Sequence, residues 1–141
     1  MAGRPAGVIV VVDASTFISA ALKAGSIPEL ALLRAVTAPS RLILSQEVED
    51  EYREVLFRPK FDRFVSAARR QLILDIVVFT SERMTSGHDV RECADPKDDK
   101  YLSLALAGGA HVIVSSDGHL LTMNPWRGIH IMPPKEFLDF G

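Results

Sequence analysis

The sequence predicts one α/β domain, in which helices cover both faces of a parallel sheet. Strand-like segments at 8–12, 41–44 and 112–114 are short and apolar without alternation, which is typical of strands buried on both faces. Segments with helical periodicity separate them, so each connection can be a right-handed crossover. The length of 141 residues suits one domain rather than two.

The first part of the chain alternates strands and helices. Four helical segments are predicted there, at residues 16–23, 27–37, 46–57 and 61–79. The third follows Ser45, a favoured N-cap residue, and places Val48, Tyr52 and Leu56 on one face. Arg58-Pro59 ends it, because the residue before a proline is disfavoured in helical conformation.

The second part of the chain adds a helix and further strands. Asp95-Pro96 begins the helix, because Asp supplies a capping oxygen and Pro is tolerated at the first helical position. Gly108-Gly109 ends it. The remaining predicted elements are strands at 112–114 and 128–132 and a short helix at 134–139.

Composition and charge narrow the class of protein. With 48% hydrophobic and 24% charged residues the chain is globular, and its net charge of −2 confines any nucleic-acid contact to a local patch. The lone Cys93 excludes an internal disulfide and a Cys-rich zinc site. The longest aliphatic run, 8–12, is too short to span a membrane, and we find no typical signal peptide. A cytoplasmic protein without a membrane partner is therefore expected.

Acidic residues stand where two of the predicted strands end. Asp13 directly follows the strand at 8–12, and Asp117 lies just beyond the strand at 112–114. Ligands of open parallel sheets bind at the carboxyl ends of the strands, so both aspartates fall on the expected functional edge. For either residue alone, a turn or helix cap is the structural alternative.

More carboxylates accompany the helix that begins near Asp95. At 100° per residue, Asp95, Asp98 and Asp99 share a side with the apolar residues of that helix, so its inward face becomes acidic at the N-terminal end. Asp95 fits an N-cap and Asp98 a capping-box position. For Asp99 the structural alternative is an interaction with the helix dipole.

The helix at 46–57 offers two acidic candidates. Glu51 and Glu49 lie on opposite shoulders of its apolar stripe, and periodicity does not choose between them. If such carboxylates converge with Asp13 and Asp117, unit charges about 4 Å apart repel by about 4 kcal/mol at an effective dielectric of 20, so a cation must lie among them. Oxygen ligands suit Mg²⁺ or Mn²⁺, which indicates phosphodiester chemistry.

Four segments, in order and spacing, resemble the PIN (PilT N-terminus) domain nucleases. They are VVDASTFISA at 11–20, LSQEVEDEYREVL with RPKF at 44–61, CADPKDDKYLSLA at 93–105 and IVSSDGHLL at 113–121. The resemblance covers nearly the whole chain and extends to bacterial toxin components of toxin–antitoxin systems, the VapC-like ribonucleases. No single motif is specific, but the ordered set of four is.

The resemblance implies a three-layer fold around a parallel sheet of about five strands, spanning 1–141 with its core at about 8–139. It also implies a metal-dependent endoribonuclease, with Mg²⁺ or Mn²⁺ held at the family's acidic positions, Asp13, Glu51, Asp99 and Asp117. The family thereby selects Glu51 over Glu49. Asp13 and Asp99 are expected as the principal ligands, and Glu51 as a ligand or as the base that holds the water.

Two serines are expected beside these carboxylates. Ser15 belongs to the small polar pair after Asp13, where the family mostly has Thr-Asn, and Ser115 matches the hydroxyl residue that begins the last strand-end turn. Ser15 is expected to hydrogen-bond a carboxylate or a water, and Ser115 to hydrogen-bond Asp13 or a bound phosphate.

The expected partners are RNA, a cognate antitoxin protein and a second copy of the chain. Arg53, Arg58 and Lys60 belong to the densest basic region and are candidates for RNA phosphate contacts, with a solvated, ion-paired helical face as the alternative. The resemblance implies the toxin role and a homodimer, in which the apolar helices at 27–37 and 61–79 could bury a shared face.

Two other functions stay open at this stage. One is a non-catalytic PIN-like module that binds RNA or protein. The other, a phosphoryl-transfer enzyme of a different α/β family, is disfavoured because Asp13 lacks a second Asp two residues on. The histidines show no metal-ligand spacing and are given no catalytic role; they are His88, His111, His119 and His130.

Overall fold

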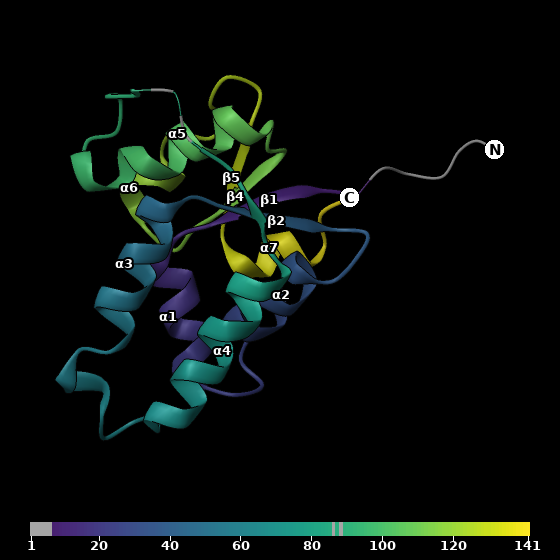
Figure 1. The fold of residues 1–141 in the computed structure, drawn as a ribbon. Helices are drawn as coiled ribbons and strands as arrows, with labels where there is room; N and C mark the ends of the chain where they lie inside the picture. Colours follow the sequence, from purple (N-terminus) through teal and green to yellow (C-terminus); the bar gives the residue numbers. More distant parts are fainter. Residues whose placement is uncertain (1–6, 86, 88) are drawn as a thin grey trace.

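A five-stranded parallel sheet forms the centre of the computed structural model, which describes residues 7–85, 87 and 89–141 (Figure 1). Its strands are β1 (Ile9–Val12), β2 (Arg41–Leu44), β3 (Glu82–Arg83), β4 (Val112–Val114) and β5 (His130–Met132). Their spatial order is β3-β2-β1-β4-β5, and every neighbouring pair is parallel. The α/β fold class predicted from the sequence is confirmed.

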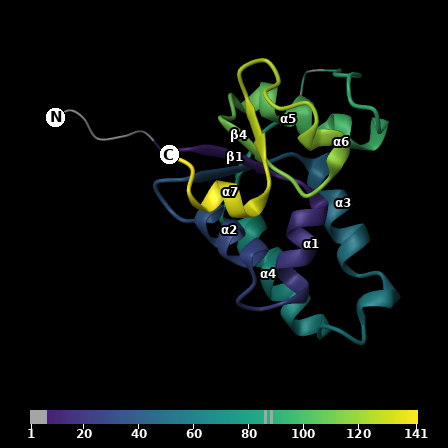
Figure 2. The same cartoon turned by 180° about the vertical axis from the view of Figure 1, so that it is seen from behind.

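Helices form a layer on each side of this sheet. They are α1 (Ala14–Leu22), α2 (Ile27–Val36), α3 (Gln46–Leu56), α4 (Ala67–Thr80), α5 (Asp99–Gly108), α6 (Gly118–Leu121) and α7 (Pro134–Leu138). Figure 1 and Figure 2 show α5 and α6 on one side and α1, α2, α4 and α7 on the other, with α7 against α2. The result is the expected three-layer arrangement.

The core fixes α1 against α3 beneath the carboxyl edge of the sheet. Phe17 of α1 stacks on Tyr52 of α3, with ring centroids 4.2 Å apart and planes 10° from parallel. Both side chains are fully buried, and each contributes about 1.5–3 kcal/mol of burial free energy. The Tyr52 hydroxyl also donates to the Val12 carbonyl. Asp13 follows Val12 and Glu51 precedes Tyr52, so this hydrogen bond holds the two acidic residues near each other.

The starts of several helices differ from the sequence-based expectation. The first helix begins at Ala14 rather than 16, because the Asp13 carboxylate caps it by accepting from the Thr16 amide at 2.9 Å. The helix predicted at 61–79 begins only at Ala67, with Ser66 as its N-cap, and a 3₁₀ turn over Pro59–Phe61 precedes it. Gly109 ends α5 as predicted, in left-handed conformation with φ of 63°.

The strand β3 was not located from the sequence. It has only two residues, both charged, and it pairs at the sheet edge with Ile43 and Leu44 of β2. A segment so short and polar carries no strand pattern.

No single helix among the described residues is long and apolar enough to span a membrane. Only α1 and α2 counted together reach the required length and composition, and they meet at a bend of 114°.

Candidate active site

Asp13 lies at the carboxyl end of the central strand β1 and is 2% exposed. Its Oδ1 accepts from the Thr16 amide, and its Oδ2 accepts from the hydroxyls of Ser15 (3.0 Å) and Ser115 (2.6 Å). Burial raises the pKa of the Asp13 carboxyl, and the hydrogen bonds from Ser115, Thr16 and Ser15 oppose that rise. No cationic side chain is paired with it among the described residues.

Ser115 connects the two strand-end aspartates. Its hydroxyl donates to Asp13 and accepts from the Asp117 amide at 2.9 Å. Asp117 caps α6 by accepting from the His119 amide at 2.8 Å. The adjacent central strands β1 and β4 thus bring Asp13 and Asp117 to one edge of the sheet.

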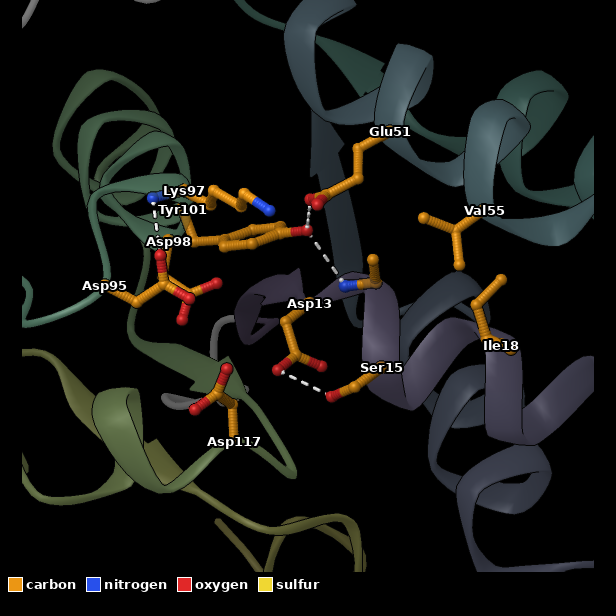
Figure 3. Close-up of a pocket in the computed structure, with 11 residues that line it drawn as sticks. Asp13, Ser15, Ile18, Glu51, Val55, Asp95, Lys97, Asp98, Tyr101 and Asp117 are labelled. Atoms are coloured by element: carbon orange, nitrogen blue, oxygen red, sulfur yellow. Dashed lines mark hydrogen bonds between the residues drawn. The ribbon is translucent and has the colours of Figure 1, made fainter. Parts of the chain in front are cut away.

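A cavity of about 380 Å³ opens at this edge (Figure 3). Its carboxylates come from the N-caps of α1 and α6, from α3 and from the turn before α5; they are Asp13, Asp117, Glu51, Asp95 and Asp98. Ile18 and Val55 form an apolar wall from α1 and α3. We call this cavity the acidic pocket.

The structure separates the two glutamates that periodicity left equivalent. Glu51 lines the acidic pocket, where its Oε1 accepts from the Tyr101 hydroxyl and from Lys100 at 3.2 Å. Glu49 is instead ion-paired with Arg53 and Arg83 outside the pocket. Burial alone would raise the pKa of Glu49, but the hydrogen bonds from the two arginines outweigh it and lower the pKa.

Tyr101 ties the Glu51 carboxylate to the backbone beside Asp13. Besides donating to Glu51, its hydroxyl accepts from the Ala14 amide at 3.0 Å. Burial raises the pKa of Tyr101, so the hydroxyl stays protonated and keeps donating. Tyr101 is not among the site residues predicted from the sequence.

Asp98, and not Asp99, faces the acidic pocket. Asp99 turns away, and its Oδ1 accepts from the backbone amides of Glu92 (3.1 Å) and Cys93 (2.8 Å). The expectation that both aspartates share an inward face is corrected here. Residues 96–98 form a 3₁₀ turn at about 120° per residue rather than 100°, which changes the direction of the side chains around it.

The Asp98 carboxylate is buried but incompletely paired. It is 8% exposed, and its Oδ2 has no hydrogen-bond partner among the described residues. Burial, together with the neighbouring Asp117, Asp95 and Asp13, raises the pKa of Asp98 to about 7. This carboxylate therefore lacks the positive partner that a buried charge requires.

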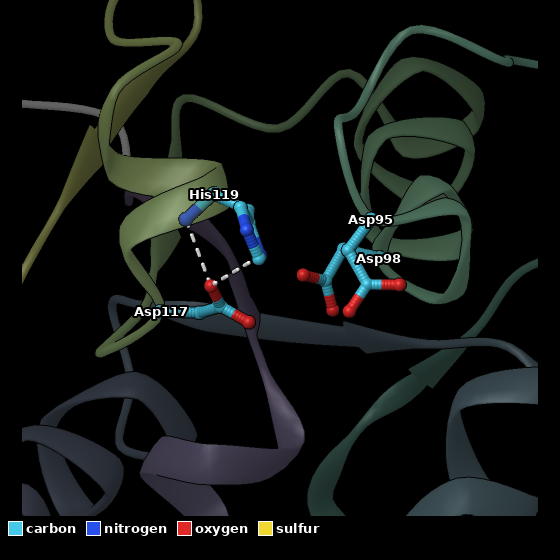
Figure 4. A group of neighbouring side chains, drawn as sticks. All are labelled: Asp95, Asp98, Asp117 and His119. Atoms are coloured by element: carbon cyan, nitrogen blue, oxygen red, sulfur yellow. Dashed lines mark hydrogen bonds and ion pairs between the residues drawn. The ribbon is translucent and has the colours of Figure 1, made fainter.

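A ligand set for a cation lies around Asp98. One atom each from Asp95, Asp98, Asp117 and His119 lie within 4.8 Å of one another (Figure 4). Carboxylate oxygens are the donors that Mg²⁺ and Mn²⁺ prefer, and an unpartnered buried oxygen is the position such an ion would satisfy. The residues present therefore fit a divalent cation.

Besides Asp98, two members of this set were not selected from the sequence, Asp95 and His119. Asp95 both caps the 3₁₀ turn, accepting from the Lys97 amide at 3.0 Å, and lines the pocket. His119 follows Asp117 by two residues in the same turn, and that proximity was the available signal. The other histidines lie elsewhere: His111 accepts from the Ile9 amide, His130 packs on Phe140, and His88 lies outside the described residues.

The predicted RNA-contact residues lie on or just after α3, outside the pocket lining. The guanidinium groups of Arg53 and Arg58 pair with Glu49 and Glu54 four residues earlier, both at 2.7 Å. Lys60 lies over the ring of Phe61. The arginine positions thus match the ion-paired helical face that was the alternative reading.

The fold and the pocket define an α/β protein with a carboxylate-rich site at the carboxyl edge of its sheet. The chain belongs to the PIN domain family, since the PIN domain model matches residues 9–119. The chain is similar to the solved structure of VapC20 of Mycobacterium tuberculosis, described as a sarcin–ricin loop cleaving toxin. The TM-score is 0.52 and the identity 18%, over 86% of this chain and 98% of that one. This likeness concerns the fold. No curated protein matches the chain.

Proposed function

We propose that the chain is a metal-dependent endoribonuclease that hydrolyses RNA phosphodiester bonds in the acidic pocket. The observation that carries this proposal is the buried Asp98 carboxylate, whose Oδ2 is unpartnered among Asp13, Asp95 and Asp117. Membership of a family whose members are typically metal-dependent nucleases supports it.

Asp13, Asp98 and Asp117 would hold Mg²⁺ or Mn²⁺, with Asp95 and His119 beside them. The ion, when bound, supplies positive charge that neutralises the phosphodiester and makes nearby water more acidic. Asp99 acts instead as a positioning residue, because its hydrogen bonds hold the 92–93 backbone beside the pocket.

Glu51 would take the proton from the attacking water. Tyr101 and Lys100 both contact its Oε1, which orients the carboxylate and leaves Oε2 to accept a proton. The water oxygen attacks phosphorus as its proton passes to Glu51, and the bond from phosphorus to the 3′ oxygen breaks. The departing 3′ oxygen takes a proton from solvent and Glu51 later releases its own to solvent, so the products carry a 5′ phosphate and a 3′ hydroxyl. Ser15 and Ser115 keep Asp13 in place throughout.

We further propose that this domain, residues 1–141, is the cytoplasmic toxin of a type II toxin–antitoxin system and a homodimer. Support comes from exposed apolar side chains at helical spacing, which are available for a protein partner. They are Ile27, Leu30 and Leu33 on α2 and Leu72, Ile76 and Phe79 on α4. Light scattering tests the dimer, and rescue of growth by the product of a neighbouring gene tests the antitoxin.

The nuclease proposal is tested with purified protein, a panel of single-stranded RNAs and Mn²⁺ or Mg²⁺, with product ends mapped by sequencing. We expect cleavage that is lost with chelator and in the folded Asp98→Asn variant. Metal binding without cleavage of any RNA would favour the non-catalytic module instead.

A further inference from the structure

A second cavity, of about 490 Å³, opens beside the acidic pocket. The two cavities share Lys97, which lies in the 3₁₀ turn before α5. Lys100, which contacts Glu51 of the acidic pocket, also lines the second cavity. A linear substrate held in the acidic pocket can therefore continue past these residues into the second cavity.

The cationic side chains of the two linings differ in their partners. Arg91 pairs with Asp89 at 2.9 Å, and Lys100 pairs with Glu51. Lys97 is exposed and forms no ion pair with any residue that the structure describes. Its ammonium group is thus the one cation of either lining that is unpaired within the described part of the chain.

The backbone of Lys97 is fixed although its ammonium group is unpaired. Its amide donates to Asp95 at 3.0 Å, and its carbonyl accepts from Lys100 at 2.7 Å. Figure 3 shows its side chain extending along the pocket toward Glu51. A positive charge is therefore presented at the junction of the two cavities by an anchored turn.

The charge of an RNA substrate requires such a group. The carboxylates of the acidic pocket repel every phosphate other than the one that a bound cation neutralises, so a neighbouring phosphate needs its own positive partner. Arg53 and Arg58 already have carboxylate partners and lie outside both linings. Lys97 has no carboxylate partner among the described residues, and it lines both cavities.

We infer that the second cavity is a subsite for the nucleotide next to the scissile bond, and that Lys97 binds the phosphate of that nucleotide. This inference rests on the proposed ribonuclease function and names a part of its substrate site. Lys97 acts on substrate binding, while the carboxylates act on the chemistry.

The test measures RNA binding separately from cleavage. In an Asp13→Asn background, the affinity for a fluorescein-labelled RNA octamer is measured by anisotropy with Mg²⁺ over a range of salt concentrations. Adding Lys97→Gln should weaken binding about tenfold and reduce the slope of log affinity against log salt by about 0.7, the value for one lost phosphate contact on a single strand. Lys97→Arg should restore most of the affinity and most of the salt slope.

The matched control is Lys23→Gln. Lys23 is also exposed and unpaired among the described residues, but it lies at the far end of α1 from Asp13. It should change neither affinity nor slope. Thermal unfolding of each variant confirms that the compared proteins are folded.

A scan with one neutral methylphosphonate linkage per octamer locates the contact. At one position in the octamer, the neutral linkage should weaken binding to the protein that retains Lys97. The same linkage should cause no further loss of affinity in the Lys97→Gln variant. Additive losses at every linkage, or an unchanged salt slope, would overturn the subsite. If RNA is cleaved by the unmodified chain and Lys97→Gln binds normally, only the subsite fails; if the unmodified chain neither binds nor cleaves RNA, the ribonuclease proposal fails with it.

Discussion

Glu49 and Asp98 are two buried carboxylates of the same molecule with opposite electrostatic surroundings. They are 5% and 8% exposed, so burial does not distinguish them. Glu49 lies between Arg53 and Arg83, and its pKa is lowered. Asp98 lies among Asp117, Asp95 and Asp13, and burial with these neighbours raises its pKa to about 7.

The difference shows which carboxylate is neutralised by side chains of the protein itself. The charge of Glu49 is neutralised by its two arginines, and nothing further is needed there. Carboxylates about 4 Å apart repel by about 4 kcal/mol at an effective dielectric of 20, so the acidic pocket stores a repulsion that a cation would relieve. A structural ion pair and a cation-binding site are thus separated by their partners and not by their burial.

The largest expected effect is on RNA cleavage. Asp98→Asn should lower the initial rate by more than about 100-fold, because a direct cation ligand is lost and outer partners alone are worth 10–100-fold. Glu49→Gln should keep the rate within about threefold. Rates are compared at one Mn²⁺ concentration with folded proteins, and equal losses in the two variants would remove the distinction.

A smaller loss of rate is expected for Asp99→Asn. The amide oxygen of Asn can still accept from the backbone of Glu92 and Cys93, so the rate should fall by no more than about tenfold. The same assay measures it beside Asp98→Asn. Abolished cleavage in Asp99→Asn with normal cleavage in Asp98→Asn would return the role of ligand to Asp99.

The aspartates also show how far the sequence could predict the site. Asp13 and Asp117 follow apolar strands, so their common edge follows from the parallel sheet alone. The sequence could not show that Asp98, and not Asp99, faces the pocket, because residues 96–98 form a 3₁₀ turn and the prediction assumed 100° per residue throughout. The role of Glu49 depends on Arg83 of β3, a strand that only tertiary pairing with β2 creates.

A moderate effect on stability is expected for Glu49→Gln. The variant loses two ion pairs, but Arg53 and Arg83 are 47% and 44% exposed and water solvates them afterwards. The free energy of unfolding should fall by about 1–2 kcal/mol. Urea denaturation measures it, with Glu54→Gln as the control, because the Glu54–Arg58 pair is exposed on both sides and should contribute little.

The smallest expected effect, a shift of a few degrees in Tm with pH, should have opposite signs for the two carboxylates. With chelator, the pKa of Asp98 is near 7 when folded and 3.8 as its usual value, so the folded chain binds the extra proton and Tm should rise as pH falls from 8 to about 5.5. The stabilisation from Glu49 is present above its usual pKa of 4.5 and is lost below it, so Tm should fall again there. Asp98→Asn should flatten the rise in Tm between pH 8 and 5.5. In the unmodified protein, saturating Mg²⁺ in place of chelator should also reduce this rise, because the ion stabilises the ionised pocket at pH 8. An unchanged rise in Asp98→Asn would show that another group carries the proton, and would end the contrast between Asp98 and Glu49.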